Sequence, residues 1–400
     1  AAEGTRFANA ISSAPITLPS HATMMTGLYP PAHGVRDNGA YALGADAKTL
    51  AERLKELGYE THAWVSAVVL HKRYMLNQGF DSYDDDLWSE ADPKMFMIRE
   101  RQAHKTVDKV IEWFNLWKTG DQAQKKPFFG WVHLFDPHQP YRAPQWAVQR
   151  TISPYDAEIA FVDSQLTRLF DALRESGELD NTLIILTADH GESLGEHEEK
   201  THAIFIYDAT LHVPLIMRLP GTVPRGKVYD GPVRHVDLVP TVLDVLRQPW
   251  EGLTQGTSLI PLIERWWGTT SLAQYSESLL AEVGFGMAPL QGIRQDGFKY
   301  IRAPRPELYD LTSDPQELTN LFPSKDNRHI DLERALDAVI KQSSQFAIAS
   351  TDNPMTKETL DALQSLGYLQ GASERKSMAG IDPKDGIKIY AKLEEARHFA

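Results

Sequence analysis

Apolar positions in the first half of the chain alternate between helical and strand-like spacing. Leu50, Leu54 and Leu57 recur at helical intervals, whereas residues 128–134 form a short and almost continuous apolar run. A run of that length is typical of a strand buried on both faces. The same criteria predict helices at 49–57, 107–117, 159–176 and 236–246, and strands at 59–65, 128–134 and 181–187. Alternating helices and buried strands predict a parallel α/β sheet.

The pattern changes after about residue 246. Residues 298–302 and 307–311 have the alternation of short strands, and prolines separate them. We expect a smaller α+β subdomain with an antiparallel sheet there. The first residues, Ala1 to Phe7, are interpreted as the end of a helix with Gly4 as its cap.

Composition limits the class of protein. The chain has 400 residues, of which 42% are hydrophobic and 24% charged, and it has no cysteine. These values are close to globular averages and exclude a disordered chain, a collagen and a coiled coil. The net charge of −13 argues against a nucleic-acid partner, which favours a basic surface. No apolar run approaches the roughly 20 residues needed to span a bilayer.

The first candidate for chemistry lies between Ala14 and Gly27. Pro19 fixes a turn, and Ser20 can cap a helix that begins near His21. Thr17 then lies just before a helix N-terminus, where backbone N–H groups favour an anion. A capped helix without any chemistry explains the local pattern equally well.

The second candidate follows the strand predicted at 181–187. Asp189 and His190 come where that strand ends, and ligands of open α/β sheets bind at such ends. A carboxylate beside an imidazole can bind a divalent cation. Solvated loop residues are the alternative. The acidic run from Asp81 to Asp86 is interpreted as an exposed loop and not as a metal site.

Three further histidines are uninformative one by one. His133 leaves the strand predicted at 128–134 and reads as a satisfied core histidine, and His138 reads as a loop residue. His202 lies in the run Lys200-Thr201-His202, which by itself indicates nothing.

Taken together, these stretches resemble the sulfatase family of the alkaline-phosphatase superfamily. The family signature is Cys or Ser, any residue, Pro-Ser-Arg-Ala, and then Thr-Gly. Here it reads Thr17-Leu18-Pro19-Ser20-His21-Ala22, followed by Thr26-Gly27. Later matches occur in family order over residues 1 to about 345, among them Tyr29-Pro30, Asn38-Gly39, Asp189-His190-Gly191-Glu192, Val213-Pro214-Leu215 and the stretch from His235 to Thr241.

The resemblance implies an alkaline-phosphatase-like α/β fold. Its mostly parallel sheet is flanked by helices, and a smaller C-terminal α+β subdomain follows. We expect a catalytic domain at 1–248, the subdomain at 249–345, a linker at 346–380 and the start of a helical repeat at 381–400. The subgroup with tetratricopeptide repeats after the hydrolase is the most similar, and such repeats would bind a protein partner.

The resemblance also implies roles by position. Thr17 matches the nucleophile, which also ligates the metal together with Asp189 and His190. His138 matches a histidine that protonates the leaving group or contacts the ester. His133 and His202 are assigned to substrate binding. His21 replaces the signature arginine beside the nucleophile, and its role in the catalytic set is left open.

Threonine at the nucleophile position changes the expected chemistry. Sulfatases oxidise Cys or Ser there to formylglycine, but oxidised threonine would be a ketone that hydrates poorly. We therefore expect no formylglycine, and a divalent metal (Ca, Mn, Mg or Zn) that activates the hydroxyl of Thr17. Its substrate would be a small anionic sulfate or phosphate ester.

One family feature is missing from the chain. The N-terminal strand that ends in two metal-binding aspartates would precede Ala1, and both ends of the chain look cut. We therefore expect an N-terminally truncated fragment with impaired metal binding and activity, and its localisation is left unassigned. Two alternatives remain open: a phospho-alcohol transferase of the same superfamily, and a non-catalytic scaffold that carries repeats.

Overall fold

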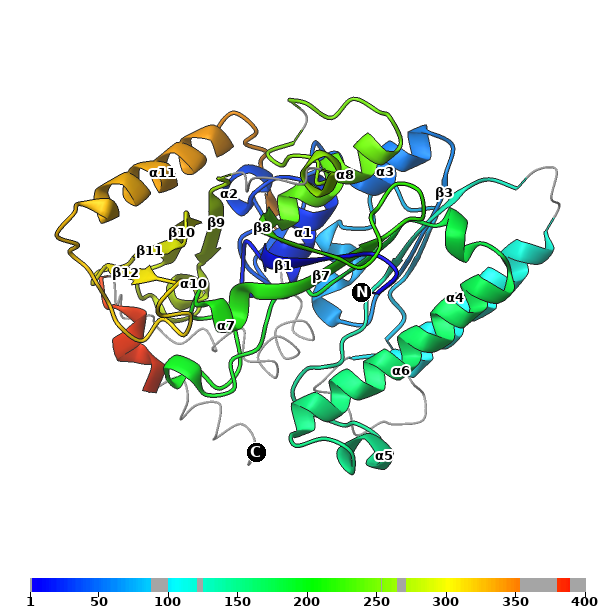
Figure 1. Ribbon diagram of the computed structural model, residues 1–400, viewed down its shortest axis with the longest axis horizontal. Coiled ribbons are helices and arrows are strands. Elements are labelled where there is room, and N and C mark those ends of the chain that lie inside the picture. Colours follow the sequence, from blue (N-terminus) through cyan, green and yellow to red (C-terminus); the bar gives the residue numbers. More distant parts are fainter. Residues whose placement is uncertain are drawn as a thin grey trace. The chain divides into compact units, whose positions relative to one another are not determined.

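The computed structural model describes residues 2–87, 100–120, 125–252, 254–264, 271–352 and 380–388. The chain divides into two compact units (Figure 1). Unit 1 comprises Ala1–Ala47 with Ile184–Ala400, and unit 2 comprises Lys48–Leu183. Within the described ranges, no helix combines the length and the apolar character needed to cross a membrane. Residues 353–379 of the predicted linker (346–380) and residues 389–400 of the predicted repeat (381–400) lie outside these ranges.

The first sheet of unit 1 has four strands in the order β6-β7-β1-β8. The strands are β1 (Thr5–Ile11), β6 (Ile184–Thr187), β7 (His212–Arg218) and β8 (Lys227–Arg234). β1 and β8 are parallel, whereas β7 is antiparallel to both β1 and β6. The predicted parallel arrangement is therefore incomplete in this sheet. The connection between β7 and β8 is short and reverses the chain direction, and β1 lies between the two strands.

The start of the chain differs from its sequence interpretation. Residues 2–4 form a turn, and β1 begins at Thr5, so Gly4 does not cap a helix. Gly4 instead approaches the neighbouring strand closely: a Cβ atom there would lie 2.1 Å from the carbonyl oxygen of Met217. The glycine is needed because the backbone of β7 occupies the space of a side chain.

Helices, 3₁₀ turns and a short strand pair make up the rest of this part of unit 1. They are α1 (Thr17–Thr26), α2 (Pro30–His33), α7 (Asp208–Leu211), α8 (Leu238–Val245), α9 (Ile260–Glu264), the 3₁₀ turns η4 (Glu196–Glu198) and η5 (His235–Asp237), and the strand pair β2 (Tyr41–Ala42) with β13 (Thr351–Asp352). α1 packs against α8 and η5, which brings residues 17–26 beside residues 235–245.

A second sheet of unit 1 confirms the predicted antiparallel subdomain. Its order is β12-β11-β10-β9, and every neighbouring pair is antiparallel. The elements are β9 (Gln274–Ser278), α10 (Leu280–Phe285), β10 (Leu290–Gln295), β11 (Phe298–Arg302), β12 (Glu307–Asp310) and α11 (Arg328–Ser343). Figure 1 shows α11 lying along this sheet. Leu332 and Leu336 of α11 belong to one buried cluster with Tyr275, Ile293 and Tyr300 of the strands.

Unit 2 has a parallel three-stranded sheet in the order β4-β3-β5. Its elements are α3 (Leu50–Glu56), β3 (Glu60–Trp64), η1 (Val68–Leu70), η2 (Lys72–Tyr74), β4 (Ser82–Asp84), α4 (Ala103–Thr119), β5 (Phe128–Val132), α5 (Gln145–Val148), α6 (Pro154–Glu175) and η3 (Leu179–Asn181). α4 and α6 pack side by side (Figure 1). The helices and strands predicted here agree with these bounds to within a few residues.

The acidic run at 81–86 is not wholly a loop, because β4 occupies its centre. Asp84 forms ion pairs with Arg101 and Lys109, both at 2.7 Å. Asp81 pairs with Lys55 at 2.7 Å and accepts the backbone N–H of Thr61. The carboxylates of Asp81 and Asp84 are thus paired with basic side chains, which their spacing in the sequence does not reveal.

Candidate active site

Thr17 is the first residue of α1, and the residue is 3% exposed. The helix starts four residues earlier than the sequence predicts, because the N-cap residue is Ile16 and not Ser20, and Ile16 makes no side-chain capping bond. Pro19 is compatible with this start, since the first turn of a helix needs no N–H donor at that position. The N–H of Leu18 instead donates to Oδ1 of Asn38 at 2.8 Å.

Ser20 therefore does not cap the helix. Its hydroxyl donates to the backbone carbonyl of Asp189 at 2.6 Å, and the hydroxyl of Ser12 donates to the same carbonyl at 2.6 Å. Nδ1 of His235 lies 3.1 Å from the Ser20 oxygen. These bonds hold the backbone of Asp189 against the start of α1.

His190 presents one nitrogen to Thr17. Nδ1 of His190 lies 2.8 Å from the carbonyl oxygen of Gly191, and this contact requires a proton on Nδ1 because a carbonyl can only accept. Nε2 then carries a lone pair, and it lies 3.4 Å from Oγ1 of Thr17. Burial lowers the pKa of His190, so the ring is neutral at pH 7.

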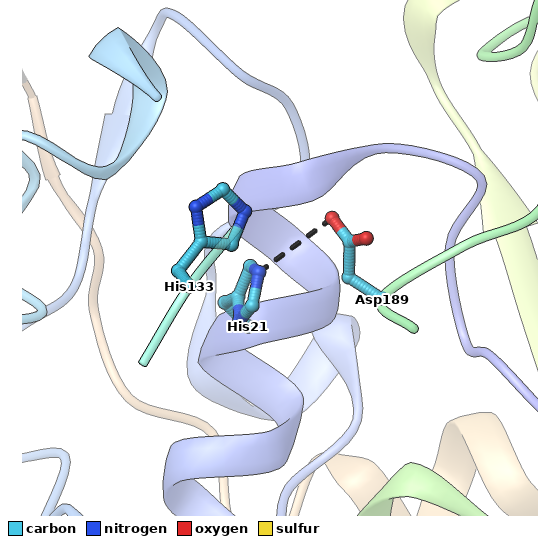
Figure 2. A group of neighbouring side chains, drawn as sticks. All are labelled: His21, His133 and Asp189. Atoms are coloured by element: carbon cyan, nitrogen blue, oxygen red, sulfur yellow. Dashed lines mark ion pairs between the residues drawn. The ribbon is translucent and has the colours of Figure 1, made fainter. Parts of the chain in front are cut away.

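Asp189 contributes the negative charge at this position. Its Oδ2 atom lies 3.5 Å from Nε2 of His190 and 3.6 Å from Nε2 of His21. Figure 2 shows the Asp189 carboxylate and the His21 ring directed toward each other. His21 follows Thr17 by one helical turn, so both side chains lie on the same face of α1.

His202 lies on the other side of His190, with ring centroids 4.2 Å apart. Its Nδ1 atom is 3.2 Å from a carboxylate oxygen of Glu192. Burial alone would lower the pKa of His202, but the Glu192 carboxylate outweighs it and the pKa is raised. The structure thus places His202 beside His190, and its assignment to substrate binding stays a prediction.

The loop that carries His202 is held by a buried glutamate. The carboxylate of Glu199 accepts the N–H of Ile204 at 2.8 Å and the N–H of Phe205 at 3.3 Å. Burial raises the pKa of Glu199 to about 8.

The donor set suits a divalent cation. Nε2 of His190 lies 3.4 Å from Oγ1 of Thr17 and 3.5 Å from Oδ2 of Asp189, and its lone pair is on that side. One carboxylate, one neutral imidazole and one hydroxyl are ligands that Mn²⁺ and Zn²⁺ accept, while Mg²⁺ and Ca²⁺ favour the oxygen atoms. The three residues that the sequence assigns to the metal therefore fit one.

His133 and His138 belong to unit 2, and each is described within it. Nδ1 of His133 accepts the N–H of Ser66 at 3.2 Å, and the carbonyl of His133 accepts the hydroxyl of Ser66 at 2.6 Å. Nδ1 of His138 lies 2.6 Å from the carbonyl of Gln139, and its ring stacks on Phe135 at 4.2 Å. Their assignment to substrate binding and to proton transfer stays a prediction.

Sequence reasoning missed several residues that support the site. Asn38, Glu192 and His235 lie in stretches that resemble the family, but no role followed from their positions. Ser12 had no signal at all, because it acts through the backbone of Asp189, which is 177 residues away in the sequence.

Comparison with known proteins identifies the family. The model of the family described as "Sulfatase" matches residues 1–248, and that described as "N-sulphoglucosamine sulphohydrolase, C-terminal" matches residues 195–345. The chain belongs to the sulfatase family. It is therefore a member of a family of ester hydrolases, and the site lies in the part of the chain that the family model covers.

Individual relatives agree with this placement. The chain is 26% identical to arylsulfatase K of Canis lupus familiaris over 85% of this chain and 76% of the relative. The solved structure of BT4656 in complex with D-glucosamine-2-N,6-O-disulfate superposes with a TM-score of 0.69 at 22% identity, covering 86% of this chain and 92% of that one. The phosphonate monoester hydrolase of Agrobacterium radiobacter gives a TM-score of 0.65 at 22% identity, covering 86% and 89%. The two structures establish the shared fold.

Proposed function

We propose that this protein hydrolyses sulfate or phosphate esters, with Thr17 as the nucleophile and with Thr17, Asp189 and His190 as ligands of a divalent metal. One observation carries the proposal: Oγ1 of Thr17 lies 3.4 Å from Nε2 of His190, at the N-terminus of α1. A hydroxyl there is close to an imidazole, which in turn lies 3.5 Å from the Asp189 carboxylate, and the imidazole and carboxylate can hold a cation. The hydroxyl also lies at backbone N–H groups that favour an anion.

A bound divalent cation would lower the pKa of the Thr17 hydroxyl and polarise the ester. Thr17 Oγ1 then forms a bond to sulfur or phosphorus while the bond to the leaving oxygen breaks. The Thr17 proton passes to solvent, and the leaving oxygen takes a proton from His138. Water hydrolyses the Thr17 ester in a second step and restores the hydroxyl.

The remaining histidines complete the proposal. His133 and His202 contact the anionic ester, as their positions in the sequence match suggest. His21 lies one turn from the nucleophile and beside Asp189, where it can orient that carboxylate. Residues 383–388 are helical, which agrees with a helical repeat that begins near residue 381 and would bind a protein partner.

The choice between sulfate and phosphate depends on Thr17. Oxidation of its secondary alcohol would give a ketone, so the formylglycine hydrate used by other sulfatases is not expected. An ordinary hydroxyl must instead form an ester that water can cleave, which favours phosphate or phosphonate esters. The relationship to arylsulfatase K favours sulfate esters.

An activity assay of this protein tests the proposal. Aryl sulfate, aryl phosphate and aryl phosphonate esters are offered with Mn²⁺, Ca²⁺, Mg²⁺ or Zn²⁺, and mass spectrometry of the peptide that contains Thr17 follows. We expect metal-dependent turnover and an unoxidised Thr17 that carries the sulfuryl or phosphoryl group during turnover. Absence of turnover with every ester, or an oxidised Thr17, would contradict the proposal.

A further inference from the structure

A single carboxylate ties the turn that carries His138 to α6. Glu158 lies in α6 and is 2% exposed. Its Oε2 atom accepts the backbone N–H of His138 at 3.0 Å, and its Oε1 atom accepts the backbone N–H of Arg142. The two oxygens therefore bind both ends of a five-residue segment that begins with His138.

The same turn is anchored to a second helix. Oδ2 of Asp136 accepts the N–H of Ala103 at 2.8 Å, at the first residue of α4. The backbone that leads into His138 is thus held by α4, and the backbone that follows is held by α6. Because α4 and α6 pack side by side in unit 2, the turn is fixed between two rigid elements.

The ring of His138 takes its orientation from the turn itself. Nδ1 donates to the carbonyl of Gln139 at 2.6 Å, and the ring stacks on Phe135 with 27° between the two planes. Both partners belong to the same short stretch of chain. A change in the backbone of this stretch therefore moves the ring, and the nitrogen that can exchange a proton with a ligand is Nε2.

Glu158 occupies an unfavourable position for a carboxylate. Burial raises the pKa of Glu158 to about 7, against the two N–H donors that lower it. The charge of Asp136 raises the pKa of Glu158 further, whereas the charge of Arg142 lowers it. A buried charge is costly unless hydrogen bonds compensate for it, and the compensation here comes from the backbone of the His138 turn.

We propose that Glu158 is a positioning residue, which holds the imidazole of His138 in place through the backbone N–H groups of His138 and Arg142. This inference rests on the proposed function, in which Nε2 of His138 gives its proton to the leaving oxygen while the bond from that oxygen to sulfur or phosphorus breaks. Glu158 itself touches no substrate. Its effect on the rate is therefore transmitted by His138.

The dependence on the leaving group separates this role from a merely structural one. An ester of 4-nitrophenol needs little protonation of its leaving oxygen, whereas an ester of phenol needs more. Glu158→Gln replaces one acceptor by an amide NH₂, which cannot accept an N–H. Since general acid catalysis contributes about 10²–10⁴-fold, we expect kcat for the phenyl ester to fall at least about tenfold more than kcat for the 4-nitrophenyl ester, with KM little changed.

A double-mutant cycle tests the transmission through His138. In a His138→Gln background, Glu158→Gln should have no further effect on the phenyl ester, because the residue through which it acts is already gone. Glu175→Gln, at the exposed end of the same helix, is the matched control and should resemble the wild type with both esters. Additive losses in the cycle would overturn the proposal, and so would equal losses with the two esters.

A second measurement keeps the two proposals distinguishable. Amide hydrogen exchange at His138 and Arg142 reports the tether without any turnover, and Glu158→Gln should accelerate exchange at one or both amides. If the wild type hydrolyses none of the esters, the proposed function fails. Unchanged exchange at the amides of His138 and Arg142 in Glu158→Gln would contradict the tether formed by Glu158, whether or not the wild type turns over an ester. Should Glu158→Gln fail to fold, Glu158→Asp, which is too short to reach both N–H groups, takes its place in each comparison.

Discussion

Oγ1 of Thr17 lies 3.4 Å from Nε2 of His190, although 173 residues separate the two in the sequence. The bond between Nδ1 of His190 and the carbonyl of Gly191 directs the lone pair of Nε2 toward the Thr17 side. The hydroxyl of the proposed nucleophile and the free ring nitrogen of a proposed metal ligand therefore face each other.

Thr17→Ala should abolish turnover, because the alanine side chain has no oxygen atom that could form the covalent ester. Thr17→Ser keeps the hydroxyl and should retain measurable activity. Steady-state kinetics with the best aryl ester provides the measurement, and both variants should keep the wild-type melting temperature within a few degrees. Turnover by Thr17→Ala comparable to that of the wild type would rule out Thr17 as the nucleophile.

Ser20→Ala should weaken metal binding without removing a ligand. The hydroxyl of Ser20 donates to the carbonyl of Asp189, and loss of such a supporting contact typically costs about 10–100-fold in metal affinity. Titration of Mn²⁺ by calorimetry measures the effect directly. Ser344→Ala, which removes an exposed hydroxyl in unit 1, is the control, and an equal affinity for both variants would contradict the supporting role.

Acid should destabilise unit 1 through His33. Burial, followed by the charge of Arg36, lowers the pKa of His33 from its ordinary 6.5 to about 3. Between these two values the unfolded chain binds a proton that the folded chain does not, so the free energy of unfolding falls as pH decreases from 6.5 to 3. The N–H of Val35 donates to Nδ1 of His33, and protonation would break this bond.

His33→Asn should reduce that pH dependence by about one bound proton. Urea unfolding at several pH values between 3 and 7 measures the slope. The exposed His212→Asn is the control for the loss of a histidine. A slope equal to that of the wild type in His33→Asn would show that other groups account for the acid sensitivity.

Lys299→Met should destabilise unit 1 strongly. Lys299 is 2% exposed and pairs with Asp208 at 3.0 Å and with Glu317 at 2.7 Å. Removing one partner of a buried ion pair leaves uncompensated charge and typically costs about 3–5 kcal/mol. Arg302→Met, on the same strand but in a partly exposed pair with Asp337, should cost less than about 1 kcal/mol. Urea denaturation of both variants measures the two losses of stability. Similar unfolding midpoints for Lys299→Met and Arg302→Met would contradict the prediction.

Much of the architecture follows from local sequence patterns. The apolar run at 128–134 and the helical spacing from Ile159 to Leu173 predict β5 and α6 because burial on two faces, or on one stripe, leaves a periodic trace. The match to a family motif likewise predicts that Thr17, Asp189 and His190 share one site. The observed contact between Thr17 and His190 agrees with that grouping.

Only the tertiary structure decides what each polar side chain binds. Ser20 follows Pro19 as an N-cap residue would, yet its hydroxyl bonds to Asp189, and the helix begins at Thr17. In the sequence, Glu158 is one of several charged residues of α6, and nothing sets it apart. In the structure, its two carboxylate oxygens accept the N–H groups of a turn that lies 16–20 residues earlier in the chain. Periodicity records which face of an element is buried, but a hydrogen bond between distant residues depends on how the elements are packed, and local sequence carries no trace of it.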